Sequence, residues 1–292
     1  MNVGLILVPS HAGDESTASS EGPKRLLEAG AVDVLARAGS AVEVQTIERR
    51  GSFRDTAVSS ADVNVQLAEA VARALCANEL PVVVAGSCNA ALGVLAGFEH
   101  ARCGAVWLDA HADFNTPEST ASGFFPGMSL AVLAGHCYRD YWSQIGDSTP
   151  IEEDAIALFG VRDLSPEEER DRLERSSIRV VGWTDGEPEG DVEAALDALR
   201  RRVADVYLHV DFDAFAPEVA PGVADEPVPG GLSRDGAETI IRGTAERFRI
   251  RAATLATYTP ERDVDDATLE LALGLLALLG GYAATTPEEA AS

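Results

Sequence analysis

Three side chains that can bind a divalent metal ion alternate within one short segment of the chain. Asp109, His111 and Asp113 lie two residues apart, directly after the apolar run at residues 105–108. On an extended backbone this spacing puts all three side chains on one face. Carboxylate and imidazole ligands together suit Mn²⁺, with Zn²⁺, Co²⁺ and Fe²⁺ as alternatives. The alternative interpretation is a polar loop facing solvent, but buried-strand residues precede the segment, so we predict a metal site.

A second acidic pair follows another apolar run. Asp211 and Asp213 come directly after residues 206–210. Carboxylates this close repel each other unless a cation or a proton joins them. An Asp-x-Asp pair alone is a weak signal, but beside the first segment it supplies the ligands for a dinuclear site. Two ions about 3.5–4 Å apart would bind and deprotonate a shared water molecule, so we predict that both acids take part in catalysis.

A third polar turn contains a cysteine. Gly86, Ser87 and Cys88 follow the apolar run at residues 81–85. Glycine and small polar residues are typical of a tight strand-to-helix turn, and Cys88 stands where a side chain would point at the site. The spacing alone favours a buried structural thiol, which is common for cysteine.

The elements that must position these residues alternate between strand and helix. Short, nearly continuous apolar runs are typical of strands that are covered on both faces. They are followed by helical patterns, and this order predicts a three-layer α/β/α fold with right-handed crossovers. Ligands bind such sheets at the carboxyl ends of the strands, where the three polar segments lie. The predicted strands are residues 3–8, 42–47, 81–85, 105–108, 155–159, 178–181, 206–210 and 250–256, and the predicted helices are 23–35, 61–76, 191–203, 234–248 and 269–282.

Composition excludes several classes of protein. The net charge of -25 repels phosphate backbones and anionic lipids, so neither a nucleic acid nor a membrane is an expected partner. The glutamates at 167–169 are interpreted as part of a solvated helix face. Four cysteines without a C-x-x-C pair, and no secretory signal, favour a reduced cytoplasmic protein. We expect one domain over residues 1–283 and a frayed tail over 284–292.

Taken together, the polar segments resemble the arginase/agmatinase (ureohydrolase) superfamily. The resemblance rests on Asp109-Ala-His111-Ala-Asp113-Phe-Asn115, on Gly160-Val-Arg162-Asp163 and on His209-Val-Asp211-Phe-Asp213. Ser20-Glu-Gly22-Pro23 resembles the early Gly-Pro turn of the family. The resemblance implies an arginase-like, eight-stranded, mostly parallel sheet and a trimer or hexamer.

The resemblance also implies a mechanism. Asp109 and Asp211 would bridge two Mn²⁺ ions, Asp113 would complete one site, and His111 and Asp213 the other. A metal-bridging hydroxide would attack the guanidinium or amidine carbon of a small guanidino substrate and cleave a linear C–N bond. The residues that match substrate-binding positions are Asn115, Ser122, Asp163 and Thr257.

The sequence departs from the family pattern at four positions. Cys88 replaces a histidine ligand. Either it binds the metal as a thiolate, which would shift preference from Mn²⁺ toward Zn²⁺ or Fe²⁺, or that metal is weakly bound or absent. Pro126 replaces a histidine that assists proton transfer. Thr257 replaces the glutamate that holds the guanidinium group, and Glu261 is the nearby carboxylate that would have to substitute for it. Ser165 replaces an aspartate, which puts recognition of a substrate amino group in doubt.

The cysteine in place of the histidine ligand, together with the loss of the proton-transfer histidine, resembles the branch that hydrolyses N-omega-hydroxy-L-arginine to hydroxyurea and ornithine. An N-hydroxyguanidine is less basic than a guanidine, which fits the neutral Thr257. Another guanidino or ureido substrate stays open, and ordinary arginase activity is the least favoured. Two further alternatives are a catalytically impaired arginase-fold protein with a binding or regulatory role, and a metal-independent Cys88–His111 dyad. Among the other histidines, His11 is predicted to lie in a surface loop and His209 to be a satisfied core residue.

Overall fold

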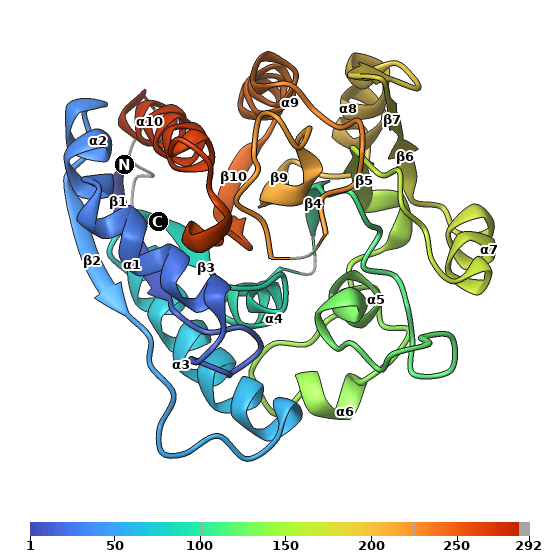
Figure 1. Cartoon of the computed structure of the whole chain (residues 1–292), viewed down its shortest axis with the longest axis horizontal. Helices are drawn as coiled ribbons and strands as arrows, with labels where there is room; N and C mark the ends of the chain where they lie inside the picture. Colours follow the sequence, from blue (N-terminus) through green and yellow to red (C-terminus); the bar gives the residue numbers. More distant parts are fainter. Residues whose placement is uncertain (101, 225, 286–292) are drawn as a thin grey trace.

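The fold is built around one sheet of eight parallel strands (Figure 1). The computed structural model describes residues 1–100, 102–224 and 226–285. The strand order is β2-β1-β3-β10-β9-β4-β5-β6, and every neighbouring pair is parallel. The predicted eight-stranded sheet is therefore confirmed. The strands are β1 (Asn2–Val8), β2 (Val42–Thr46), β3 (Glu79–Ala85), β4 (Cys103–Leu108), β5 (Ile156–Phe159), β6 (Arg179–Val181), β9 (Asp205–Asp211) and β10 (Arg249–Ala256).

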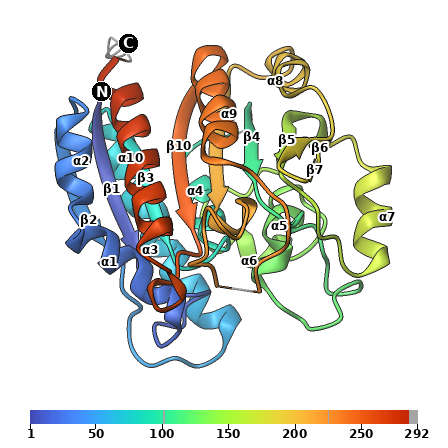
Figure 2. The same ribbon diagram turned by 45° about the horizontal axis from the view of Figure 1, so that its top comes forward.

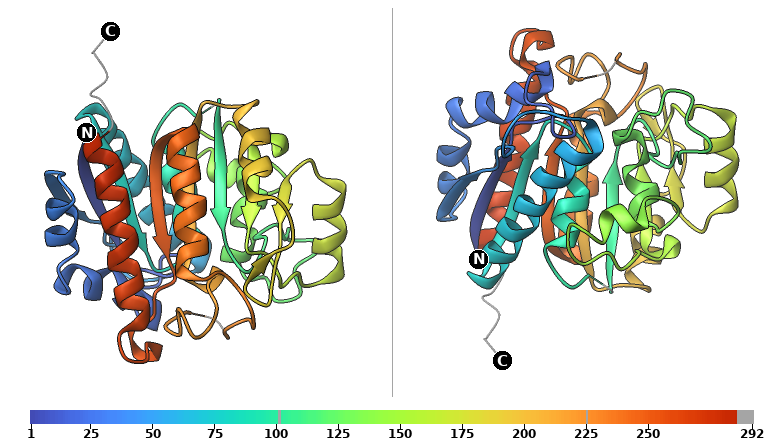
Figure 3. Two further views of the ribbon diagram at one scale, coloured as in Figure 1. Left: turned by 90° about the horizontal axis from the view of Figure 1, so that it is seen from above. Right: turned by 90° about the horizontal axis from the view of Figure 1, so that it is seen from below.

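Helices cover both faces of the sheet, as the two views of Figure 3 show. One layer holds α2 (Ala31–Arg37), α10 (Ala267–Thr285), α9 (Arg234–Arg247) and α8 (Val192–Arg200), which contact one another in that order. The other layer holds α3 (Thr56–Cys76), α4 (Ala90–Ala96) and α5 (Ser129–Leu133). The central strands are buried on both sides, which explains why their sequences are continuously apolar. The remaining elements are α1 (Gly22–Glu28), α6 (Arg139–Trp142), α7 (Glu167–Arg175) and the antiparallel pair β7 (Trp183–Thr184) and β8 (Glu187–Pro188).

Four predicted helices differ from the structure by more than one residue. The helix expected at residues 61–76 begins earlier, since α3 starts at Thr56, and the helix expected at 191–203 ends earlier, since α8 ends at Arg200. The helix expected at residues 23–35 is two helices, α1 and α2, because Gly30 adopts a left-handed conformation with φ of 97° between them. The last helix is longer than the predicted 269–282, since α10 ends at Thr285. The first two residues of the expected frayed tail, 284 and 285, are therefore helical, and the rest of that tail lies outside the described residues.

Helix α10 is apolar and 19 residues long, which is enough to cross a membrane by length and composition alone. It contacts α2, β1 and β3, and its face with Leu271, Leu275 and Leu279 is buried. These contacts are those of a helix that covers a sheet in the core of the protein.

The strand order decides where the polar segments meet. Strands β3, β10, β9 and β4 are consecutive neighbours at the centre of the sheet. Because they are parallel, their carboxyl ends lie at one edge, opposite the edge where the N-terminus enters β1 (Figure 2). The ends of these four strands and the turns after them carry Cys88, Thr257, Asp211 and Asp109, in the same spatial order as the strands.

Candidate metal centre and active site

The loops at this edge enclose a cleft of about 330 Å³. It lies where the four central strands end, which is the position expected for a ligand site in a parallel sheet. Every residue that the sequence singled out for the site contributes to its lining. These residues are Cys88, Asp109, His111, Asp113, Asn115, Ser122, Asp163, Asp211, Asp213 and Thr257.

His111 bridges two buried carboxylates at the tips of β4 and β9. Its Nδ1 lies 3.0 Å from Asp213 Oδ2 and 3.4 Å from Asp109 Oδ1. The backbone continues this link, since the N–H of Ala110 donates to Asp213 Oδ1 at 3.0 Å. Asp109 is held further by the indole N–H of Trp107, which donates to Oδ2 at 3.0 Å. The first acidic segment and the second are therefore joined directly.

Asp211 joins the other two strand tips. The thiol of Cys88 donates to Asp211 Oδ2 at 2.8 Å, and the hydroxyl of Thr257 donates to Oδ1 at 2.5 Å. The backbone N–H of Asp213 also donates to Oδ1, at 2.8 Å. Thr257 therefore orients a predicted metal ligand. Its φ of 73° lies in the left-handed region, which for a β-branched residue marks a constrained position.

Burial and crowding control the protonation of these acids. Burial, together with the charge of Asp213, raises the pKa of Asp109 to about 6. Burial and neighbouring carboxylates also raise the pKa of Asp113 and of Asp211 well above the usual value. For Asp213, burial works in the same direction, but the cationic His111 and its hydrogen bonds outweigh it and lower the pKa to about 2. Such a cluster holds protons or cations, because its negative charges cannot all stand unpaired.

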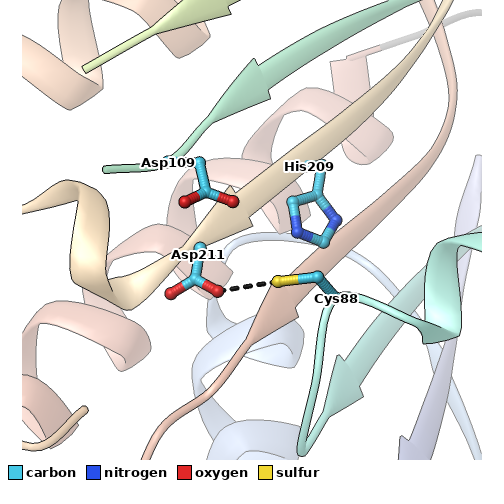
Figure 4. A group of neighbouring side chains, drawn as sticks. All are labelled: Cys88, Asp109, His209 and Asp211. Carbon is cyan, nitrogen blue, oxygen red and sulfur yellow. Dashed lines mark hydrogen bonds between the residues drawn. The ribbon is translucent and has the colours of Figure 1, made fainter. Parts of the chain in front are cut away.

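The donor atoms form two adjacent groups that fit a metal ion. One group consists of Cys88, Asp109, His209 and Asp211 (Figure 4), and the other of Asp109, His111 and Asp213. Within each group the ligand atoms lie within 4.8 Å of one another. Asp109 belongs to both groups, as expected for a bridging ligand. Oxygen, nitrogen and sulfur donors in this combination suit a divalent transition metal.

Asp113 and Asp211 differ from the arrangement that the family resemblance implies. Asp211 belongs to one ligand group rather than to both. Asp113 belongs to neither, although it lines the cleft and its Oδ2 is buried without a hydrogen-bond partner among the described residues. A φ of 49° at Asp113 bends the chain after His111, so the alternation predicted for an extended backbone ends at this residue.

Three of the four residues expected to bind substrate, Asn115, Ser122 and Asp163, are more exposed than the four acids, whereas Thr257 is buried beside Asp211. The side chain of Asn115 is held by Ser165, another residue of the cleft lining, because its Nδ2 donates to the carbonyl of Ser165 at 3.1 Å. Ser122 and Asp163 are exposed, and Asp163 Oδ2 lies 3.9 Å from His111 Nε2. An exposed carboxylate on the rim can contact a cationic part of a ligand.

Glu261 does not occupy the position of the missing glutamate. It is exposed in the short 3-10 helix Pro260–Arg262 and does not contribute to the lining of the cleft. The polar group that β10 offers at its tip is the neutral hydroxyl of Thr257, and the proposed substitution by Glu261 is not supported.

The structure corrects three residues outside the predicted site. Glu169, expected on a solvated helix face, is 3% exposed and lines the cleft. Its carboxylate accepts from the backbone N–H groups of Phe114 and Ser165, and burial raises its pKa to about 7. His11, expected in a surface loop, also lines the cleft. His209, expected to be satisfied in the core, is buried but leaves Nε2 without a hydrogen-bond partner among the described residues.

The guanidinium group of Arg162 fixes the loop that carries Asp213. Half-buried Arg162 lies just after β5 and donates to backbone carbonyls of residues 213–215 and 228–229 as well as of its own turn. The sequence resemblance singles out this arginine, and its contacts indicate a structural role. The accepting carbonyls belong to Gly160, Asp213, Ala214, Phe215, Val228 and Pro229.

Comparison with known proteins agrees with the fold. The family model described as "Arginase family" matches residues 1–280. An arginase from Bacillus caldovelox is 29% identical over 295 residues, which cover 96% of this chain and 98% of that protein. The solved arginase from Bacillus subtilis superposes with a TM-score of 0.84 at 28% identity, covering 96% of this chain and 99% of that one. The solved arginase from Bacillus caldovelox gives 0.83 at 28% identity, covering 98% and 99%. This chain belongs to the arginase family.

Proposed function

We propose that this arginase-family chain is a dinuclear metal hydrolase that cleaves a linear C–N bond of a small guanidino compound. The observation that carries the proposal is the pair of ligand groups that share Asp109 at the tips of the central strands. Both groups border the same cleft, where a substrate can enter. The side chains that the proposed reaction needs thus come from the ends of β3, β4, β9 and β10.

The chain's own residues hold the reacting groups in place. Trp107 and Thr257 fix the carboxylates of Asp109 and Asp211, which would be ligands together with Cys88, His111 and Asp213. Two divalent ions bound there, Mn²⁺ in the first instance, would lower the pKa of a shared water molecule and polarise the guanidino carbon.

A proton must also reach the departing nitrogen. Pro126 lines the cleft where a proton-transferring histidine is expected from the family resemblance. Glu169 lines the same cleft, and its pKa of about 7 allows it to hold a proton near neutral pH. An acid with a pKa near the working pH is well suited to proton transfer, so Glu169 is our proposed donor.

The neutral tip of β10 supports a substrate that is less basic than arginine. Thr257 already donates its hydroxyl proton to Asp211, and Glu261 lies outside the cleft. Among the described residues, this tip therefore places no carboxylate in the lining of the cleft that could form an ion pair with a guanidinium group. N-omega-hydroxy-L-arginine is our first candidate, because its N-hydroxyguanidine is less basic. L-Arginine is the second, because the relatives from Bacillus caldovelox and Bacillus subtilis are named arginases.

The proposal is tested by turnover with purified, metal-loaded protein. Urea, hydroxyurea or amine release is measured with N-omega-hydroxy-L-arginine, L-arginine, agmatine, guanidinobutyrate and formiminoglutamate. We expect metal-dependent hydrolysis, fastest with the hydroxylated substrate. The variant Asp213→Asn removes a proposed metal ligand. Its rate of hydrolysis should fall by more than the roughly 10–100-fold that the loss of an outer-shell partner costs. Faster turnover of another compound would overturn the substrate assignment, and metal binding without turnover of any would favour a binding or regulatory protein.

A further inference from the structure

His209 lies on β9, two residues before Asp211, and is 0% exposed. Its ring stacks on Trp107, with 3.7 Å between ring centroids and 17° between planes. Its Nδ1 lies 3.0 Å from the hydroxyl oxygen of Tyr207. Its Nε2 is buried and has no hydrogen-bond partner within the described residues. A buried polar atom without a partner is rare in native proteins and calls for an explanation.

The hydrogen bonds around the ring decide which nitrogen carries the proton. The hydroxyl of Tyr207 donates to Thr254 Oγ1 at 2.7 Å. A phenol has only one proton to donate, so Tyr207 must accept at its oxygen from the Nδ1–H of His209. The Nε2 atom of the neutral ring then carries a lone pair, which is the form in which histidine binds a metal.

The Nε2 lone pair of His209 faces the side chains of Cys88, Asp109 and Asp211. As deprotonated metal ligands, these three groups have no proton to donate to it. Figure 4 shows the ring of His209 beside Cys88, Asp109 and Asp211, and their ligand atoms all lie within 4.8 Å of one another. Each of the three is also buried. A lone pair turned toward carboxylates in a water-poor site is unfavourable unless a cation lies between them.

We propose that His209 binds a divalent ion through Nε2, together with Cys88, Asp109 and Asp211. The inference rests on the proposed function, since it requires that ions bind at the strand tips. This inner site offers one thiolate, one imidazole and two carboxylates, a four-ligand set that suits Zn²⁺ better than Mn²⁺. The outer group, with Asp109, His111 and Asp213, offers only oxygen and nitrogen. The two positions are therefore chemically unequal, with the softer metal at the inner one.

Tyr207 is a positioning residue in this arrangement. By accepting from Nδ1–H it fixes the tautomer and orientation of His209, as outer-shell partners do for metal-binding histidines. Tyr207→Phe should keep the aromatic packing and weaken the inner site by about 10–100-fold.

The experiment compares Zn²⁺ binding by the full chain with that of a matched pair of variants. His209→Phe keeps a ring against Trp107 and removes the ligand. His100→Phe is the control, because His100 is also buried beside a tryptophan but bonds backbone carbonyls with both nitrogens. After chelator treatment and titration with Zn²⁺, metal analysis should find two ions in the wild type and in His100→Phe. His209→Phe should retain one, with the affinity of the inner site reduced beyond the roughly 10–100-fold of an outer-shell loss.

A second measurement keeps the test valid if His209→Phe does not fold. Long-range ¹H–¹⁵N spectra of the wild-type histidine side chains report each ring nitrogen separately. Addition of Zn²⁺ should shift the Nε2 resonance of His209 while its Nδ1 stays protonated. An unchanged His209 resonance in protein that binds two ions would overturn this inference and leave the proposed function standing. Failure of the wild type to bind any Zn²⁺ or Mn²⁺ would overturn both.

Discussion

At the residue scale, the acids of this site act as a unit because contacts between neighbouring strand tips join them. Asp109 and Asp213 are joined through His111, and Asp211 is joined to Cys88 and Thr257. The types and spacing of the acids could be predicted from the sequence, since each follows a buried strand. The role of Thr257 could not, because its contact with Asp211 spans 46 residues of sequence.

The bond from Thr257 to Asp211 can be tested with a matched pair of variants. Thr257→Val removes the hydroxyl but keeps the shape, so Asp211 loses an outer-shell donor. Metal affinity should fall by about 10–100-fold. Thr257→Ser keeps the hydroxyl and should stay close to wild type. Isothermal titration with Mn²⁺ measures both, and equal affinities of the two variants would contradict the assignment.

Glu169 should make stability depend on pH. Its pKa is raised by burial from a usual value of 4.5 to about 7, so between these values the folded protein keeps a proton that the unfolded chain releases. The contribution of Glu169 to the free energy of unfolding is therefore fully present below pH 4.5, and it is lost as the pH rises through about 7. At about 1.4 kcal/mol per pKa unit, its size is on the order of 3 kcal/mol.

The test compares metal-free wild type with Glu169→Gln by urea unfolding between pH 4.5 and 7. The wild type should lose stability as the pH rises, and the variant should show a flatter profile. The nearby acids titrate in both proteins, so the difference between the two slopes isolates Glu169. Parallel profiles would show that this carboxyl group is not held in its protonated form.

At the element scale, the strand tips could be predicted but the walls of the cleft could not. Continuous apolar runs identified all eight strands within two residues of their bounds. Glu169 stands in a run of three glutamates that look alike in sequence, and only the packing of α7 against the segment after Asp113 buries the third one. His209 is a similar case, because its neighbour Trp107 comes from another strand.

Gly86 should be essential to the turn after β3. A Cβ atom at this position would lie 2.6 Å from the carbonyl oxygen of Ser10, so the turn that carries Cys88 must shift. Gly86→Ala should lower the free energy of unfolding by about 1–3 kcal/mol, as overpacking does. It should weaken metal binding as well. Gly281→Ala is the control, because nothing lies within 4 Å of a Cβ atom there and the residue is helical. The Gly281→Ala variant should be about 0.5–1 kcal/mol more stable than the wild type.

Urea unfolding of both glycine variants, with metal titration of the folded proteins, checks this pair. A Gly86→Ala variant with unchanged stability and unchanged metal affinity would mean that the turn adapts without moving Cys88.

At the scale of the whole molecule, charge and topology act together. The net charge of -25 creates a field that attracts cationic guanidino compounds, and exposed Asp163 stands at the mouth of the cleft. The parallel topology then gathers residues from distant parts of the sequence at one edge of the sheet. The fold class followed from the alternation of elements, whereas the pairing of β9 between β10 and β4, which completes the site, is a long-range property.

The central claim is that two cations are held side by side at these strand tips and share Asp109. Crystals of the protein grown with Mn²⁺, and others grown with Zn²⁺, allow the ions to be located by anomalous scattering. The account predicts two peaks on either side of the Asp109 carboxylate, one beside Asp211 and one beside His111 and Asp213. Data from metal-loaded crystals with no peak at this edge of the sheet, or with peaks that do not contact Asp109, would contradict it.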